Sequence, residues 1–314
     1  MRRTFRVAAL AAMAVLAAGA GLPVSAAQTS KAATFDSSRA YEYLRQMVSF
    51  GPRPAGSPAL KQTRAYITAQ LAAAGLTVSP QTFIAQLPTV GPTEMVNLIV
   101  RLPGRRSDRI LFTGHYDTKR EKDFPFVGAS DAASSAALLM ELARALKDRP
   151  REFTYEFVWF DGEEATCEGW DECSRSGAPD NLYGSRFYVE AARKAGTLAS
   201  VRAMILVDMV GARNLKVLRE TQYSAGWLID VVWATAKRLG YGDTFLDVPY
   251  PVDDDHLPFV RAGVPSLDII DLRDYPQWHT AQDDLAHVGA GSLGIVGDVL
   301  VAAVQDIEKH LGTS

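Results

Sequence analysis

Three short stretches of the sequence carry side chains that could hold a metal ion and move a proton. They contain Asp131 in FVGASDAAS, Glu163 and Glu164 in WFDGEEAT, and His279 in QWHTAQDD. A catalytic zinc ion takes three protein ligands from the His, Asp and Glu set and keeps one position open. The second carboxylate of an adjacent acidic pair can then act as a general acid and base. The conjunction of the three stretches therefore predicts a catalytic metal site.

We expect Asp131, Glu164 and His279 to bind the metal and Glu163 to transfer protons. Taken alone, Asp131 would more often cap the helix that follows it, and His279 would more often be an ordinary loop histidine. Two adjacent glutamates would repel each other unless they shared a cation. Successive strand residues point to opposite sides, so one glutamate can face the metal and the other the substrate. Spacing alone leaves the reverse assignment of the two glutamates open.

Two aspartates are further candidates for proton chemistry. Asp208 lies in the apolar run AMILVDMV, where an unpaired carboxylate would be costly. Asp254 belongs to the run Asp253–Asp255, for which a solvated turn is an equally simple interpretation. If Asp208 and Asp254 converge with Glu163, the three carboxyl groups share protons and the pKa of at least one rises.

The elements that must position these residues alternate between strand and helix patterns. Apolar strand patterns cover residues 76–86, 95–102, 109–117, 155–164, 203–211 and 266–272. Helical patterns cover residues 37–50, 60–74, 135–146, 182–195, 226–240 and 293–311. This alternation predicts a single α/β domain with a mostly parallel central sheet and helices on both faces. His115, the two glutamates and Asp208 lie late in strand patterns, near the carboxyl ends where open α/β sheets bind ligands.

Composition and the N-terminus indicate an exported globular protein. The chain has 314 residues, 47% hydrophobic and 22% charged, with a net charge of -3 and no recurring basic run. These values argue against a nucleic-acid-binding protein. Residues 1–26 resemble a signal peptide, with a basic start, an apolar run over 7–24 and a small-residue cleavage site, and an uncleaved membrane anchor is the alternative. We expect a domain over 27–314, periplasmic or secreted, without stable membrane association after cleavage.

The two cysteines of the chain, Cys167 and Cys173, lie close together in the loop after the glutamate pair. In an oxidising compartment they could close a small disulfide ring. The alternative is a pair of reduced thiols without a role.

The order of these motifs resembles that of the zinc-dependent glutaminyl-peptide cyclotransferases over almost the whole mature chain. The likeness is carried by HYDTK, FVGASDAASSAALLMELARAL, WFDGEEA, NLYGSR, VDMVGA, DDHLPFVRAGVPSLDII and WHT. The parent superfamily, the zinc aminopeptidases, shares a looser form of these motifs. The resemblance implies one zinc ion per chain on the three predicted ligands, Glu163 as general base and acid, and Asp208 and Asp254 as supporting aspartates.

The resemblance also implies a substrate pocket. Trp170 and Trp278 match its aromatic walls, Lys119 takes the lysine position of an HYDSK-type turn, and Tyr275 stands near a family phenylalanine. The loop after Glu164 is longer than in the animal enzymes and carries its own two cysteines, so Trp170 lies in a variable loop.

The implied reaction converts the N-terminal glutamine of peptides or proteins to pyroglutamate and releases ammonia. The main alternative is a two-zinc aminopeptidase, because the chain holds every ligand type that such a site needs, in His115, Asp131, Glu164, Asp208 and His279. A binding domain that has lost its metal is a third interpretation, and the intact ligand set argues against it. The strings DDHLPF and LYGSR, with Lys119 and Trp278, favour the cyclotransferase.

Overall fold

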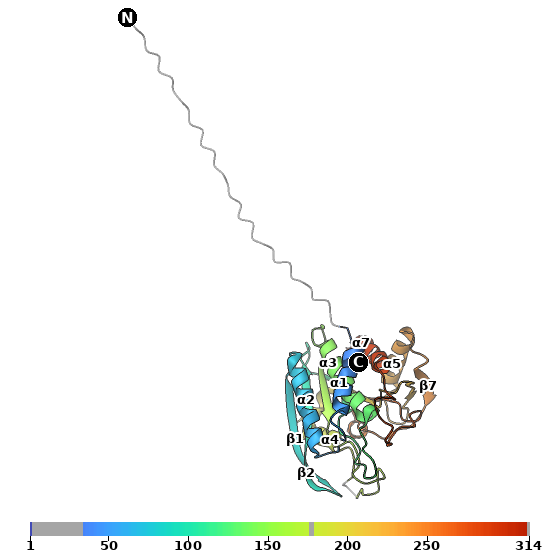
Figure 1. Ribbon diagram of the computed structural model, residues 1–314. Helices are drawn as coiled ribbons and strands as arrows, with labels where there is room; N and C mark the ends of the chain where they lie inside the picture. Colours follow the sequence, from blue (N-terminus) through green and yellow to red (C-terminus); the bar gives the residue numbers. More distant parts are fainter. Residues whose placement is uncertain (2–33, 176–178, 313–314) are drawn as a thin grey trace. The chain divides into compact units, whose positions relative to one another are not determined.

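The computed structural model describes Met1 and residues 34–175 and 179–312 (Figure 1). The helices and strands among these residues lie in one compact unit, Ala32–Ser314. The predicted signal peptide, residues 1–26, falls outside the described residues except for Met1.

A six-stranded sheet forms the centre of this unit, in the order β1-β2-β4-β3-β5-β8. Strands β4, β3, β5 and β8 are parallel to one another, whereas β2 pairs antiparallel with both β1 and β4. The predicted α/β domain with a mostly parallel sheet is confirmed, and an antiparallel hairpin extends one edge. The strands are β1 (Val78–Leu87), β2 (Gly91–Leu102), β3 (Arg109–His115), β4 (Thr154–Phe160), β5 (Val201–Asp208) and β8 (Ser266–Ile270).

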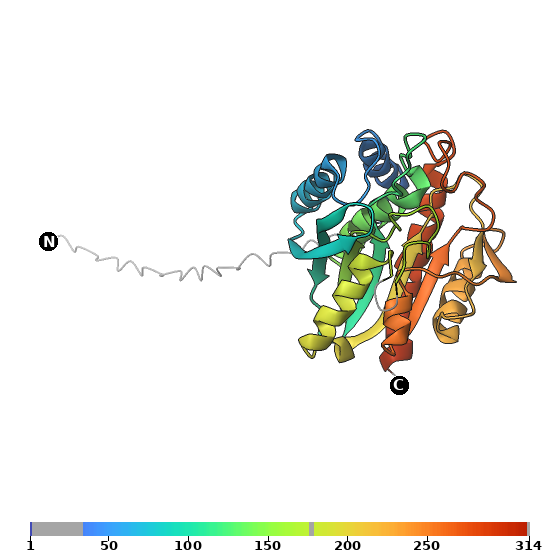
Figure 2. The same ribbon diagram turned by 90° about the horizontal axis from the view of Figure 1, so that it is seen from below.

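Helices cover both faces of the sheet, and Figure 2 shows the yellow-green α4 and the red α7 lying alongside the strands. Alternate strand residues enter two separate cores: Phe112 of β3 packs in the first and Leu111 in the second. The first core is covered by α1 (Ser37–Val48), α2 (Pro58–Ala73), α3 (Ser135–Leu146), α5 (Gly226–Arg238) and α7 (Ala290–Gly312). The second is covered by α4 (Tyr183–Lys194) and α6 (Leu257–Arg261).

Short elements are the main difference from the predicted arrangement. The sequence patterns predict neither the two-stranded sheet of β6 (Val217–Arg219) and β7 (Phe245–Pro249) nor α6. Such segments are too short to show a period, since β6 has three residues and α6 has five. The 3-10 turn Leu198–Ser200 belongs to the same group.

Among the described residues, α7 is the one helix long and apolar enough to cross a membrane. Its apolar side chains have another explanation, because Leu293, Val296 and Leu300 are fully buried in the first core. The helix packs against α1, α3 and α5. Its hydropathy is therefore that of a central core helix.

Candidate active site

The candidate side chains gather at the carboxyl ends of the parallel strands. His115 is the last residue of β3 and Asp208 is the last residue of β5. Both are buried, with 1% and 6% of their surface exposed. Because β3 and β5 are paired neighbours, their ends place these two side chains together.

The Glu163–Glu164 pair lies in a loop and not, as predicted, in a strand. Strand β4 ends at Phe160, three residues earlier. Asp117 holds this loop: its Oδ1 accepts the N–H of Glu163 at 3.2 Å and its Oδ2 accepts the N–H of Glu164 at 3.4 Å. The conformation of this loop therefore sets the directions of the two glutamate side chains. The alternation of side chains along a strand plays no part.

Asp131 lies in a π-helical turn, Ala129–Ser134, and does not cap α3. Its φ of -107° and ψ of 91° are non-helical. Gly128 makes the turn possible, because its φ is +50° and a Cβ there would lie 1.8 Å from the carbonyl oxygen of Asp131. Asp283 fixes the turn from outside by accepting the N–H groups of Ser130 at 2.7 Å and Asp131 at 3.0 Å.

The three predicted metal ligands form one cluster. His279 Nε2 lies 3.3 Å from Asp131 Oδ2 and 3.2 Å from Glu164 Oε1. One possible ligand atom from each of the three residues lies within 4.8 Å of the other two. Glu164 Oε2 is buried without a hydrogen-bond partner, which is costly for a carboxylate unless a ligand satisfies it.

The electrostatics of this cluster favour a bound cation. Burial lowers the pKa of His279, but Glu164 and Asp131 outweigh it and raise that pKa to about 10. Burial raises the pKa of Asp131, but the hydrogen bonds and charges of His115 and His279 together outweigh burial and lower that pKa below its ordinary value. The two carboxylates thus stabilise a positive charge where His279 stands. A divalent cation would supply this charge and leave the imidazole neutral, as a metal ligand must be.

A second cluster shares Asp131 with the first. His115 Nε2 lies 3.2 Å from Asp131 Oδ1 and 3.1 Å from Asp208 Oδ1. Burial lowers the pKa of His115, but Asp208 and Glu163 raise it well above its ordinary value. Asp208 Oδ1 also accepts the Ser135 hydroxyl at 3.0 Å. The residues of a two-metal site are therefore together, as the aminopeptidase alternative requires.

Glu163 and Asp254 are buried carboxyl groups that favour the protonated form. Burial raises the pKa of Glu163 well above its ordinary value, His115 lowers it, and Glu164 and Asp254 add to the rise. Burial and then Asp268 and Asp208 raise the pKa of Asp254, whose Oδ2 has no hydrogen-bond partner. The expected convergence of carboxyl groups is therefore present, and a proton can be held beside the metal cluster.

One pocket of about 300 Å³ contains these groups. Trp170 and Trp278 both line it, as do Val252, Ile270 and Leu272. Trp278 stacks on His279 with ring centroids 4.2 Å apart and stays 44% exposed. The pocket thus joins a polar floor of carboxylates to an apolar, aromatic wall.

The side chains of Lys119 and Tyr275 both bond to other groups of the protein, so neither is placed as a simple substrate contact. Lys119 lines the pocket, but its Nζ donates to the carbonyl oxygens of Ala165 at 3.0 Å and Cys167 at 2.7 Å. Tyr275 is 4% exposed and is not among the residues that line the pocket. Its hydroxyl donates to Asp283 at 2.7 Å, which places it behind the metal cluster.

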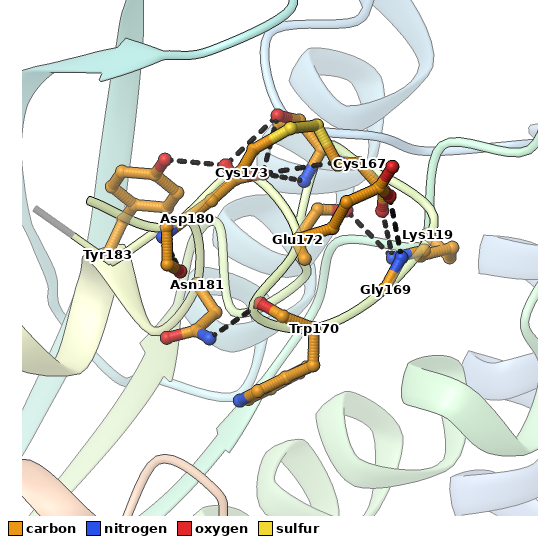
Figure 3. Close-up of a disulfide and its surroundings, with 12 residues drawn as sticks. Lys119, Cys167, Gly169, Trp170, Glu172, Cys173, Asp180, Asn181 and Tyr183 are labelled. Atoms are coloured by element: carbon orange, nitrogen blue, oxygen red, sulfur yellow. Dashed lines mark hydrogen bonds between the residues drawn. A yellow bond between two sulfur atoms is a disulfide. The ribbon is translucent and has the colours of Figure 1, made fainter.

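Cys167 and Cys173 are joined by a disulfide with a Cα–Cα distance of 6.0 Å, as the sequence suggests (Figure 3). Asp180 lies close to both sulfur atoms. The three do not form a metal site in this state, because each sulfur is bonded to the other. Asp180 instead accepts the N–H groups of Thr166 at 3.0 Å and Cys167 at 3.1 Å.

Sequence reasoning missed the residues that hold the site from behind, namely Asp117, Asp283 and Arg53. Arg53 is fully buried, and its guanidinium donates to the carbonyl oxygens of Val127 at 2.7 Å and Gly128 at 3.0 Å. Arg53 lies in the GPRPAGSP turn, which has no helical or strand periodicity that would identify a buried arginine. The one available signal is an acidic pair, Asp283–Asp284, just after His279.

Comparisons with known proteins agree with this geometry. Residues 97–304 match the model of peptidase family M28. A glutaminyl-peptide cyclotransferase-like protein of Bos taurus is 30% identical over 265 residues, which cover 75% of this chain and 67% of that protein. The chain therefore belongs to peptidase family M28, and within that family it groups with the glutaminyl-peptide cyclotransferases.

The solved structures similar to this chain include both a glutaminyl cyclase and a protein described as an aminopeptidase. A glutaminyl cyclase from an Acidobacteriales bacterium is 34% identical, with a TM-score of 0.81 over 90% of this chain and 98% of that one. A structure described as a leucine aminopeptidase precursor from Bacteroides thetaiotaomicron is 28% identical, with a TM-score of 0.79 over 87% and 98% of the two chains.

Proposed function

We propose that this protein is a zinc-dependent glutaminyl-peptide cyclotransferase, an acyltransferase that acts on peptides or proteins with an N-terminal glutamine. One zinc ion per chain is held by Asp131, Glu164 and His279. The unpartnered Oε2 of Glu164 and the mixed carboxylate and imidazole donor set fit this ion. When bound, zinc supplies Lewis acidity toward the side-chain carbonyl of the glutamine.

Glu163 moves the proton in this proposal. Its carboxylate accepts a proton from the α-amine as the amine nitrogen forms a bond to the side-chain amide carbon, Cδ. The bond from that carbon to the amide nitrogen then breaks, and Glu163 returns the proton to the departing ammonia. A raised pKa suits this exchange, because the group must both take and give a proton near neutral pH.

Asp254 and Asp208 support the reacting groups. The Oδ2 of Asp254 has no hydrogen-bond partner and is free to bond to the amide nitrogen that becomes ammonia. Asp208 holds His115 and lies at the same pocket floor.

The observation that carries the proposal is the aromatic wall beside a proton-holding carboxyl group. Trp170 and Trp278 confine the pocket next to Glu163. A short glutamine side chain confined there has to lie against its own α-amine, which supplies the proximity that ring closure needs.

The second candidate is a two-metal aminopeptidase, favoured by the cluster of His115, Asp131 and Asp208. The two are separated by incubating the zinc-loaded protein with a Gln-initiated dipeptide amide and with leucine p-nitroanilide. The cyclotransferase releases ammonia and leaves the peptide bond intact. Release of p-nitroaniline together with two bound ions per chain would establish the peptidase.

For the location of the protein, the basic and apolar N-terminus supports export through a cleaved signal peptide, to the periplasm or outside the cell. Nucleic acid and a stable membrane contact have no part in the proposal.

A further inference from the structure

The loop that carries Trp170 begins between two buried charges of opposite sign. Lys119, 3% exposed, donates to the carbonyl oxygens of Ala165 and Cys167. Asp180, fully buried, accepts the N–H groups of Thr166 and Cys167 and the hydroxyl of Tyr183. Both charges therefore act on main-chain groups at Cys167, and the first cysteine of the disulfide is fixed at the base of the loop.

The disulfide turns the following residues into a ring. Cys173 returns to Cys167 after six residues. Inside the ring, the N–H of Gly169 donates to Glu172 Oε2 at 3.1 Å, and the N–H of Glu172 donates back to the carbonyl oxygen of Gly169 at 3.2 Å. Figure 3 shows that the indole of Trp170 extends away from the sulfur atoms and out of the ring.

A hydrogen bond from outside the ring also reaches Trp170. Its carbonyl oxygen accepts the Asn181 side-chain amide at 3.1 Å, and Asn181 is 3% exposed. Within the described residues its indole stacks on no other aromatic ring, whereas Trp278 stacks on His279. Trp278 thus packs on His279, whereas Trp170 stands on the disulfide ring.

We propose that the Cys167–Cys173 disulfide and Asn181 are positioning groups that hold Trp170 against the substrate, so that reduction of the disulfide weakens substrate binding. An external dithiol would reduce it: two electrons and two protons pass to the two cysteines, which become thiols, and the dithiol becomes a disulfide. The three zinc ligands, Asp131, Glu164 and His279, lie outside the ring, as does Glu163, and all four keep their geometry. The inference rests on the proposed function, because it concerns the pocket of that reaction.

The test compares the oxidised protein with two opened forms: a Cys167→Ser/Cys173→Ser variant, and wild type reduced with dithiothreitol, freed of reductant and reloaded with zinc. Each is assayed with a Gln-initiated dipeptide amide. We expect KM to rise about tenfold in both opened forms, with kcat and zinc content within twofold of the oxidised protein. Reoxidation of the reduced wild type restores KM.

A double-mutant cycle isolates the part played by Trp170. The disulfide is opened in a Trp170→Ala background, where we expect less than a twofold further change in KM because the wall is already gone. Asn181→Ala should raise KM about threefold, and Asn214→Ala, at an exposed position after β5, serves as the matched control. An unchanged KM in the opened forms, or an equal increase with and without Trp170, would overturn the inference.

Failure of the proposed function gives a different result. If the wild type makes no pyroglutamyl product but cleaves leucine p-nitroanilide, the cyclotransferase is excluded. The same comparison is then made with KM for that substrate. Hydrogen exchange of residues 166–173 is measured on the same samples and does not depend on activity. Faster exchange after opening supports the ring as the device that holds Trp170, and unchanged exchange contradicts it.

Discussion

At the scale of single residues, the assignment of Glu163 is the sharpest claim. Glu163→Gln keeps the shape of the side chain and removes its ability to accept a proton. We expect kcat to fall by about 10²–10⁴-fold, the range typical of a general acid and base. Bound zinc, measured by elemental analysis, should stay at the wild-type level because Glu163 is outside the ligand set.

The matched control is Glu190→Gln on the exposed surface of α4, which should leave kcat unchanged. Full activity of the Glu163→Gln protein would end its assignment as the proton carrier.

Tyr275 has a different role in the structure, where it bonds to Asp283, from the substrate-pocket role that the sequence predicts. If its role is to hold Asp283, Tyr275→Phe should weaken zinc binding about tenfold, as expected for the loss of a group behind a ligand, and leave KM unchanged. Zinc affinity is measured by chelator competition. Tyr241→Phe, which loses a hydroxyl bond to Asp298 at the surface, is the control. A rise in KM without a loss of zinc would restore Tyr275 as a pocket wall.

The sequence identified the chemistry of this site better than its supports. A ligand set is recognisable because few residue types bind zinc and each one stands in a distinctive short motif of the sequence. Asp117 and Asp283 accept hydrogen bonds from main-chain N–H groups that are far away in the sequence. No local sequence pattern predicts such a bond. The wrong strand assignment for Glu163 has the same origin, since Asp117 sets that loop.

At the scale of elements, the turn that presents Asp131 depends on Arg53. Arg53→Met would leave the carbonyl oxygens of Val127 and Gly128 buried without a donor. Because each unsatisfied group costs about 1–3 kcal/mol, we expect a loss of about 3 kcal/mol in the free energy of unfolding, with weaker zinc binding. Urea denaturation measures the first and chelator competition the second.

Arg45→Met is the comparison, because Arg45 forms an exposed ion pair with Glu42 and should change nothing measurable. Equal behaviour of the two variants would refute the role of Arg53.

Asp161 follows β4, bonds to the middle of β2 and to the residue after β3, and should make stability depend on pH. Its Oδ2 accepts the N–H of Val96 at 2.8 Å and the Tyr116 hydroxyl at 3.0 Å. Burial and then Asp117 raise the pKa of Asp161 to about 7. The folded state therefore holds a proton that the unfolded state releases near pH 4. The stabilising contribution is complete below pH 4 and is lost as pH rises through 7, by at most about 1.4 kcal/mol per unit.

The measurement is urea denaturation at pH 5 and pH 7 with constant zinc. Asp161→Asn cannot titrate, so the gap between wild type and variant should favour the wild type more at pH 5 than at pH 7. A gap independent of pH would show that Asp161 keeps an ordinary pKa.

The elements themselves were largely predictable. Helix α3 has the predicted bounds because its apolar face repeats with the helical period over three turns. The antiparallel pairing of β1 and β2 was not predictable. The direction of a strand depends on the strands it pairs with, and its own sequence does not indicate it.

At the scale of the whole molecule, zinc should contribute to folding stability. The cluster of Asp131, Glu164 and His279 exists only in the folded chain, so an ion bound there stabilises it by about 4 kcal/mol at a thousandfold excess over Kd. For a domain of this size, chelation should lower Tm by about 10 °C, and added zinc should restore it. Calorimetry with and without chelator measures the shift. Mg²⁺, which prefers oxygen ligands alone, should not restore it. An unchanged Tm would mean that no ion is held.

The two tryptophans of the pocket stand on segments outside the sheet, whereas His115 and Asp208 stand at the ends of strands β3 and β5. Natural variation can therefore alter which peptides enter without touching the reaction itself. Relatives of this protein are then expected to diverge most in selectivity, along the ring and the stretch before His279, while the machinery beneath drifts little. A library randomised only at those two stretches is the natural starting point for changing substrate preference.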